Sequence, residues 1–202
     1  MPKLLLATTN RGKIREYRSL LGGLQFELVT PDAVGIDIDV KENCPSYEEN
    51  ARMKAVAYAG ASHIIALADD SGLEVDVLSG EPGIRSARAA GEAAGDKDRI
   101  ELLLSRLKGI PLEKRTAHFK CVIAIATPEG RIELCHGDCS GLIVLEPKGK
   151  NGFGYDPVFY LPEFKKTMAE LPLEIKNKIS HRGKAAREAY RVLERIAEKV
   201  KL

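Results

Sequence analysis

Short apolar runs recur along the chain and predict its β-strands. Three of them, at 3–8, 26–29 and 63–69, are mainly apolar, which is typical of strands buried on both faces. Two longer runs, at 116–127 and 131–146, are separated only by the turn sequence Pro-Glu-Gly, and this spacing predicts a β-hairpin. The chain therefore has strands both near its N-terminus and in its second half.

Segments with apolar residues three or four positions apart lie between these strands and predict helices. One follows residues 8–13, a second covers 46–61 and opens with the capping-box pattern Ser-x-x-Glu, and a third covers 96–109. A last helix is expected from Ser180 to the end of the chain. This alternation followed by a hairpin predicts an α/β fold with a mixed sheet, and we expect the hairpin to extend as a second lobe with a cleft between the lobes.

The composition indicates a globular protein with a single domain over residues 1–202. Of the 202 residues, 44% are hydrophobic and 30% are charged, and the net charge of +2 is too small to indicate a nucleic-acid-binding protein. The apolar stretch Leu4 to Ala7 is too short for a signal peptide, and no run is long enough for a membrane span. The spacing of the four cysteines fits no zinc site, so we expect reduced thiols and a cytoplasmic location. From the small net charge and the short apolar runs we expect neither a nucleic-acid nor a membrane partner.

The first of four polar segments lies between a predicted strand and a predicted helix and has the composition of a phosphate site. Free N–H groups and the helix dipole favour an anion at a helix N-terminus, and a lysine adds positive charge. The spacing of a P-loop is absent, and a plain N-cap with a turn is the alternative. The candidate residues are Thr8, Thr9, Asn10, Arg11, Gly12 and Lys13.

Two adjacent aspartates, Asp69 and Asp70, follow the third predicted strand and precede Ser71. In a continuous strand the two side chains would point to opposite faces, so we expect the strand to end here with at least one carboxylate facing the cleft. Mg²⁺ binds one or two such carboxylates together with substrate phosphates; an Asx turn that closes the strand is the alternative. So close a pair is expected to titrate as a unit, with Asp70 the first choice of proton acceptor and Asp69 the second.

A glycine-rich segment over 149–157 predicts a close approach of the backbone to a ligand. Glycines permit this approach, and Phe153 or Tyr155 offers a ring for stacking on a planar base. A glycine-rich turn between strands is the competing interpretation. The candidate binding residues are Phe153, Gly154, Tyr155 and Asp156.

Cations gather in the segment 176–184, where the last helix is expected to begin. They are Lys176, Lys178, His181, Arg182 and Lys184. Positive charge at a helix N-terminus opposes the helix dipole, so a bound anion or polar ligand explains the cluster better than structure alone. A solvated basic face is the alternative. The hydrogen-bond donors of these side chains make the segment, His181 and Arg182 included, a candidate for base recognition.

Six segments of the chain resemble the inosine triphosphate pyrophosphatase family, and they occur in order over nearly its whole length. They are ATTNRGKIRE (7–16), EENARMKA (48–55), ADDSGLEVDVLSGEPGIRSAR (68–88), GFGYDPVF (152–159), MAEL (168–171) and KNKISHRGKA (176–185). Each segment alone is short, but six in sequence are very specific.

The resemblance implies a Mg²⁺-dependent homodimeric enzyme that cleaves dITP, ITP and XTP to the monophosphate and pyrophosphate. It also implies an elongated mixed sheet with flanking helices. Residues 8–13 would bind the phosphates, Asp70 would act as the metal-linked proton acceptor, and Ser71 would touch the substrate. The remaining nucleotide contacts would come from Phe153, Gly154, Tyr155, Asp156, Lys176, His181 and Arg182.

One metal ligand is less clearly defined by the resemblance. Many relatives carry two adjacent glutamates before the second helix, whereas this chain has Lys41 followed by Glu42. Glu42 is therefore a candidate ligand, and an exposed loop carboxylate is the alternative. Two other functions compete with catalysis: a nucleotide-binding module without hydrolysis, and a nucleic-acid-binding protein that uses the basic residues 176–187. The paired aspartates argue against the first, and the absence of a continuous basic stripe argues against the second.

Overall fold

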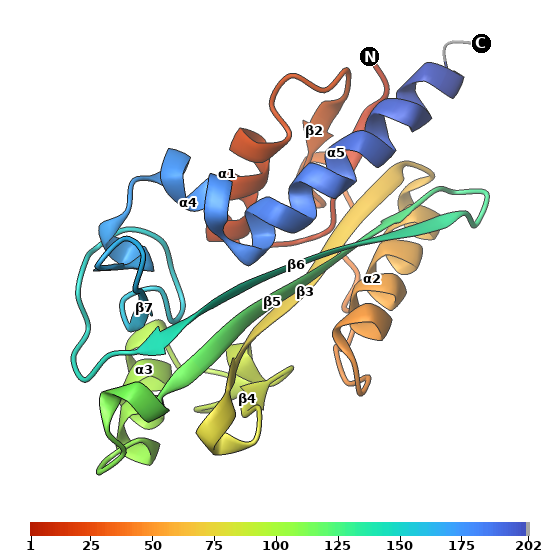
Figure 1. Cartoon of the computed structure of the whole chain (residues 1–202). Coiled ribbons are helices and arrows are strands. Elements are labelled where there is room, and N and C mark those ends of the chain that lie inside the picture. The colour runs from red at the N-terminus through yellow and green to blue at the C-terminus, as the bar shows by residue number, and fades with distance from the viewer. Residues whose placement is uncertain (201–202) are drawn as a thin grey trace. The chain divides into compact units, whose positions relative to one another are not determined.

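The structure, a computed structural model, describes residues 1–200, with side chains up to residue 198. Strands and helices alternate through the first half of the chain, and two long strands follow (Figure 1). The strands are β1 (Lys3–Leu6), β2 (Glu27–Val29), β3 (Ile65–Val75), β4 (Pro82–Gly83), β5 (Thr116–Ala126), β6 (Ile132–Ile143), β7 (Phe159–Leu161) and β8 (Lys166–Thr167). The helices are α1 (Arg11–Leu20), α2 (Tyr47–Ser62), α3 (Asp96–Arg106), α4 (Leu173–Ile179) and α5 (His181–Val200).

The strands form one mixed sheet, as the alternation of elements predicted. Its order is β2-β1-β3-β5-β6-β7-β8, and β4 pairs with β3. Strand β1 is parallel to β2 and β3, whereas β4, β7 and β8 pair in antiparallel fashion with their neighbours. The parallel part places the C-terminal ends of β1 and β2 at the same edge, where loops commonly carry functional side chains.

The chain divides into two compact units, each with its own apolar core. Unit 1 comprises Met1–Asp70, Cys121–Gly137 and the chain from Arg182 onward. In its core α1 and α5 pack against one face of β1, β3 and β5, and α2 lies on the other side of these strands (Figure 1). The fully buried side chains of this core include Leu4, Leu6, Tyr17, Leu67, Ile123, Ala189 and Leu193.

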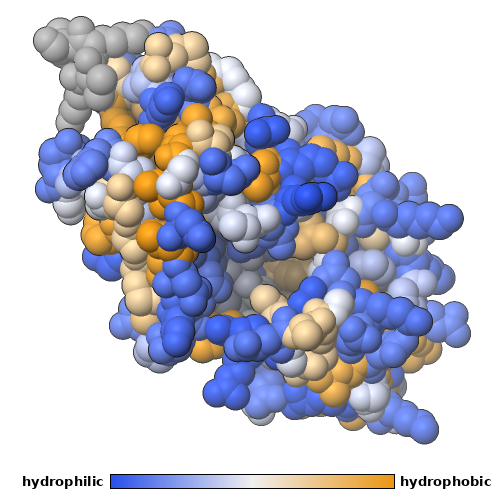
Figure 2. All heavy atoms as spheres, turned by 180° about the vertical axis from the view of Figure 1, so that it is seen from behind, coloured by the Kyte–Doolittle hydropathy of each residue, from blue (hydrophilic) through white to orange (hydrophobic). Residues whose placement is uncertain are grey.

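Unit 2 comprises Ser71–Lys120 and Asp138–His181. Its core is built by α3, by the parts of β3, β5 and β6 that belong to this unit, and by β7 with the chain on either side of it. The buried residues that form it include Leu73, Val75, Leu103, Leu107, Phe119, Ile143, Val158, Phe159 and Met168. Charged and polar side chains cover much of the face in Figure 2, as the 30% of charged residues leads one to expect. None of the described helices is long and apolar enough to cross a membrane.

The structure corrects the predicted end of the third strand. Strand β3 does not end at Asp69 and Asp70 but continues to Val75, and both aspartates are buried within it. The strand can carry these carboxylates because cations and an amide from neighbouring helices surround them. The end of β3 forms a β-hairpin with β4, since Leu73 and Glu74 pair with β4 in antiparallel register.

The structure also corrects the placement of the basic segment. Lys176 and Lys178 lie in the last turn of a separate short helix, α4. The helix dipole stabilises positive charges at this end of a helix. Ser180 ends α4, and α5 begins at His181. The argument that all five cations oppose one dipole therefore fails. The predicted β-hairpin is confirmed, with Thr127 N–H donating to the Arg131 carbonyl across its turn.

Candidate functional site

In unit 1, the N-terminus of α1 follows directly on the C-terminal end of β1 and is open to anions. Asn10 caps the helix, with its Oδ1 accepting from Lys13 N–H at 3.1 Å, and the Thr8 hydroxyl accepts from Asn10 N–H at 3.2 Å. Thr9, Asn10 and Arg11 are exposed, and the first turn contains no acidic residue. The helix dipole and the first-turn N–H groups thus favour a phosphate here.

The Asp69 side chain lies at the centre of a buried group of charges. Its Oδ1 lies 3.0 Å from Lys13 Nζ, and its Oδ2 accepts from Arg182 Nε and Nη2, each at 3.3 Å. Arg182 Nη1 donates to Glu16 Oε2 at 2.8 Å. We call Lys13, Glu16, Asp69 and Arg182 the charge cluster. Its two cations and two carboxylates balance one another, and all but the half-buried Lys13 are buried.

The charge cluster fixes the ionisation of Asp69. Burial alone would raise the pKa of this carboxyl, but Lys13, Arg182 and Lys54 outweigh burial and hold the pKa well below its ordinary value. The opposite occurs at Cys121, whose Sγ lies 3.9 Å from Asp69 Oδ2: burial and the Asp69 charge raise its pKa to about 12. Cys121 is therefore a neutral thiol next to the ionised carboxylate of Asp69.

The Asp70 side chain has different surroundings. Asn50 Nδ2 donates to Asp70 Oδ2 at 2.9 Å from the buried side of α2. Burial is the main reason why the pKa of Asp70 is raised; the Asn50 hydrogen bond opposes this shift, and the charge of Glu42 adds to it. The two aspartates are therefore not equivalent, because one is held ionised by cations and the other is a carboxyl with raised basicity.

Lys54, one helical turn after Asn50, connects Glu42, the other candidate metal ligand, to β3. Its ammonium pairs with the Glu42 carboxylate and donates to the Asp69 carbonyl at 2.7 Å. Burial disfavours the charged form, but Asp69 and Glu42 keep the pKa of Lys54 raised. Glu42 itself is half-buried.

Asp70 and Glu42 have the donor chemistry that suits Mg²⁺. The Glu42 charge contributes to the raised pKa of Asp70, so the two carboxylates repel each other and a divalent cation would relieve this repulsion. Among the described residues no group of three or more His, Cys, Asp or Glu side chains could hold a metal ion. Two carboxylates are sufficient for Mg²⁺ only when water and substrate phosphates complete its coordination.

In unit 2, the glycine-rich segment forms a hydrogen-bonded loop around Asp156. Asp156 Oδ2 accepts from Phe153 N–H at 2.9 Å and pairs with the Lys176 ammonium, which also lies 5.0 Å from the centre of the Phe153 ring. Gly152 has φ +76°, and a Cβ at this position would overlap the Asp156 carboxylate. The loop therefore requires glycine here.

Two contacts from other segments support this loop. The Gly154 N–H donates to Asp96 Oδ2 at 2.7 Å, at the start of α3, and the Tyr155 hydroxyl donates to the Ser86 carbonyl at 3.1 Å. Tyr155 is buried and its ring lies in the core of unit 2. Of the two predicted aromatic platforms, Phe153 is the half-buried one, so it remains the candidate for stacking.

The other predicted residues of unit 2 are His181 and Ser71. His181 is buried and stacks on Phe119, with ring centres 4.6 Å apart and planes inclined by 16°. Ser71 is half-buried in β3. The structure thus brings Phe153, Asp156 and Lys176 together in unit 2, and Lys13, Asp69 and Arg182 together in unit 1.

Three residues of the site were not predicted as such: Glu16, Asn50 and Lys54. Asn50 and Lys54 are polar residues at positions i and i+4, on a helix face whose other buried residues are alanines and tyrosines. Two buried polar side chains on an apolar face need partners, and this spacing is a signal that the sequence offers. Glu16 gives no such signal, because its partner Arg182 is far away in the sequence.

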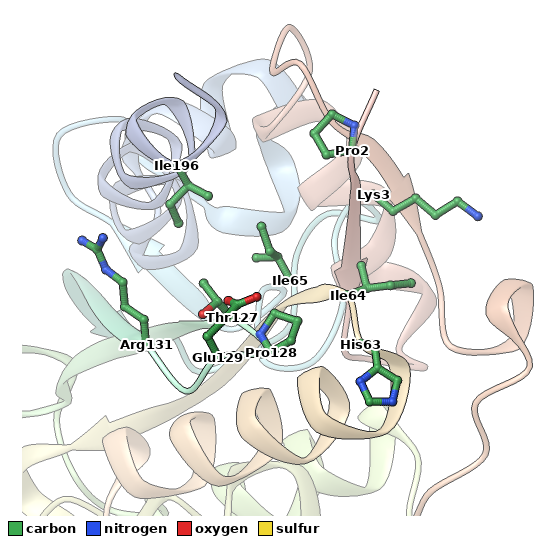
Figure 3. A pocket seen from close by; sticks show the side chains of 10 residues that line it. All are labelled: Pro2, Lys3, His63, Ile64, Ile65, Thr127, Pro128, Glu129, Arg131 and Ile196. Carbon is green, nitrogen blue, oxygen red and sulfur yellow. The ribbon is translucent and has the colours of Figure 1, made fainter. Parts of the chain in front are cut away.

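A pocket of ≈ 620 Å³ in unit 1 lies away from these residues (Figure 3). The described residues that line it are Pro2, Lys3, His63, Ile64, Ile65, Thr127, Pro128, Glu129, Arg131 and Ile196, and the predicted site residues are not among them. Lys3 begins β1 and Thr8 follows its end, so the pocket and the phosphate segment are at opposite ends of this strand. The pocket has no part in the site.

Comparisons with known proteins agree with this fold. The sequence profile of the Ham1 family matches residues 4–192. The dITP/XTP pyrophosphatase of Desulforamulus reducens is 50% identical over 194 residues, which cover 96% of each chain, and that of Bacillus subtilis is 43% identical over 194 residues, 96% of this chain and 98% of the relative. A HAM1 protein from Coxiella burnetii has a TM-score of 0.86 and 40% identity over 96% of this chain and 98% of its own.

Fold and site together define an α/β protein in which an exposed helix N-terminus and buried carboxylates lie in one unit. The chain belongs to the Ham1 family. The family expected from the sequence is thereby confirmed, and so is the expected class of enzyme, a pyrophosphatase.

Proposed function

We propose that this protein hydrolyses the non-standard purine nucleoside triphosphates dITP, ITP and XTP to the monophosphate and pyrophosphate, and thereby removes them from the nucleotide pool. The names of the relatives, dITP/XTP pyrophosphatases, support the substrates. The observation that carries the proposal is the inequality of the two aspartates. Asp69 is ionised and bound by two cations, whereas the carboxyl of Asp70 has a raised pKa and is suited to accept a proton.

The triphosphate would bind at the N-terminus of α1. The exposed N–H groups of its first turn and the Lys13 ammonium would stabilise the charge of the β and γ phosphates and of the departing pyrophosphate. Thr8, Thr9, Asn10, Arg11 and Gly12 would provide the surrounding hydroxyls, amides and backbone. Asp69 forms an ion pair with Lys13 and holds it in place, so its part in the reaction is to position a cation.

Asp70 would take the proton from the attacking water, a role that its raised pKa favours. Asp70 and Glu42 would also hold Mg²⁺, which neutralises phosphate charge and orients the water when it is bound. Lys54 pairs with Glu42 and donates to the backbone carbonyl of Asp69, so it would help to keep the two candidate ligands in place.

The other predicted residues would contribute the nucleoside contacts. Phe153 would stack on the base, and Ser71, Gly154, Tyr155 and Asp156 would complete the contacts. Lys176 pairs with Asp156 and holds it in the loop. His181 and Arg182 would distinguish a 6-oxo purine from adenine, since arginine has donors only and adenine presents an amino group at position 6. A cytoplasmic location and assembly as a homodimer belong to the same proposal.

A pyrophosphate-release assay with Mg²⁺ tests the proposal across ITP, dITP, XTP, GTP and ATP. We expect the 6-oxo, non-standard nucleotides to be hydrolysed with a kcat/KM that exceeds that of ATP by at least about 10²-fold, the discrimination that a hydrogen-bonding site provides against a mismatched group. A protein that binds ITP without releasing pyrophosphate would be a nucleotide-binding module instead.

A further inference from the structure

Asn50 is a buried side chain with no role in the function described above. It lies in the first turn of α2, and its accessible surface is 0%. A primary amide carries two donors and an acceptor, so its burial is costly unless both ends are paired. In this structure both ends are paired.

The two partners of Asn50 determine how its amide is oriented. Its Oδ1 accepts from the Cys44 backbone N–H at 3.0 Å, and its Nδ2 donates to Asp70 Oδ2 at 2.9 Å. A backbone N–H can only donate and an ionised carboxylate can only accept. A flipped amide would therefore place its NH₂ against the Cys44 N–H and its oxygen against the Asp70 carboxylate, and both hydrogen bonds would be lost. Asn50 is therefore locked in one orientation, and it fixes one oxygen of Asp70.

The hydrogen bond with Cys44 connects Asn50 to the loop that carries the other candidate ligand, Glu42. Cys44 lies two residues after Glu42, in the loop that precedes α2. One turn further along the helix, Lys54 pairs with Glu42 itself. Asn50 thus links the strand that carries Asp70 to the loop that carries Glu42, through a single side chain on a rigid helix.

We propose that Asn50 is a positioning residue for the divalent cation, because it orients the Asp70 carboxylate and anchors the Glu42 loop at the same time. The proposal rests on the proposed function only in assigning the cation to Asp70 and Glu42. Asn50 is fully buried, so we place its effect on Asp70 and on the Glu42 loop and not on the nucleotide. Residues that orient a metal ligand typically contribute about 10-fold to 100-fold to metal affinity.

The test compares Asn50→Leu with the wild type and with Arg52→Leu. Leucine has nearly the shape of asparagine and none of its hydrogen bonds, whereas Arg52 is exposed on the same helix and tests the effect of the substitution on α2 alone. Mn²⁺ binding to the protein without nucleotide is measured by electron paramagnetic resonance, and Asp70→Asn locates the bound ion. Thermal unfolding reports the stability of every variant.

We expect the dissociation constant for Mn²⁺ to rise by at least about 10-fold in Asn50→Leu and to change less than about twofold in Arg52→Leu. In the same variant, IMP binding measured in EDTA is expected to stay within about twofold of the wild type, since the phosphate segment is not altered. If Asn50→Leu does not fold, Asn50→Ala replaces it with the same expectation.

Wild-type Mn²⁺ affinity in a folded Asn50 variant would show that the residue is merely structural and would overturn the proposal. The same conclusion follows if Asp70→Asn leaves Mn²⁺ binding unchanged, because the ion would then lie elsewhere. These results are independent of catalysis: a wild-type protein that releases no pyrophosphate from ITP contradicts the proposed function, while the Mn²⁺ affinities still decide about Asn50.

Discussion

Asp69 and Asp70 are neighbours in β3, yet their carboxylates have partners on different helices. Asp69 contacts Lys13 of α1 and Arg182 of α5, whereas Asp70 contacts Asn50 of α2. Successive side chains of a strand point to opposite faces, and here each face meets a different set of polar groups. The strand therefore separates two carboxylates that would otherwise repel each other, and it gives them opposite pKa shifts.

Asp70→Asn should abolish Mg²⁺-dependent hydrolysis and leave the fold intact. An amide of the same shape can still accept from Asn50, but it cannot take a proton and carries no charge for a cation. We expect kcat to fall on the order of 10²-fold or more, the effect of losing a general base. Pyrophosphate release from ITP at saturating Mg²⁺ measures this, and turnover near that of the wild type would exclude the role given to Asp70.

Asp69→Asn should destabilise the protein by about 3–5 kcal/mol at neutral pH, because Lys13 loses its counter-ion and Arg182 keeps only Glu16. The folded-state pKa of Asp69 is below its ordinary value of 3.8, so its stabilisation is present above pH 3.8 and is lost as the pH falls toward the folded-state pKa. Urea unfolding of both proteins at several pH values tests this. The difference in unfolding free energy should shrink below pH 3.8; a constant difference would contradict the assignment.

Lys13→Ala should weaken the binding of a triphosphate far more than that of a monophosphate. The ammonium is placed to contact the β or γ phosphate, and such a charge-assisted contact contributes roughly 1.5–3 kcal/mol. Calorimetric titration of ITP and IMP without divalent cation gives both affinities. Equal weakening of the two ligands would mean that Lys13 acts only through its ion pair with Asp69.

Arg182→Ala should lower kcat/KM for ITP and XTP strongly and change that for ATP little, if the guanidinium donates to the 6-oxo group. Its partners Glu16 and Asp69 hold the group in a fixed orientation, which is the condition for selective recognition. The variant will also lose stability, so the comparison uses kcat/KM ratios at a temperature where it is folded. A uniform loss for all four nucleotides, GTP included, would identify Arg182 as a support of Asp69 alone.

The regular elements were predictable because their signals are local. Periodicity gave the first three strands, the hairpin and the main helices, and β–α alternation gave the mixed sheet. The end of β3 was not predictable in this way. Two aspartates normally terminate a buried strand, and only the cations supplied by α1 and α5 allow β3 to continue to Val75.

The candidate site was predictable as a set of residues but not as an arrangement. The segment motifs pointed to Lys13, Asp70 and Arg182 individually. That Arg182 binds Asp69 and Glu16 depends on contacts between positions more than 100 residues apart, which no local pattern encodes. The distinction between Asp69 and Asp70 likewise came from their surroundings, because the sequence presents them as identical side chains.

The thiols of this chain differ sharply in accessibility. Cys121, Cys135 and Cys139 are buried, and Cys44 is half-buried in the loop before α2. A maleimide dye should therefore react first at Cys44, two residues from Glu42, without any engineered cysteine. The wild-type sequence thus already contains an attachment point for a fluorescent reporter beside the carboxylate whose environment a metal titration would change.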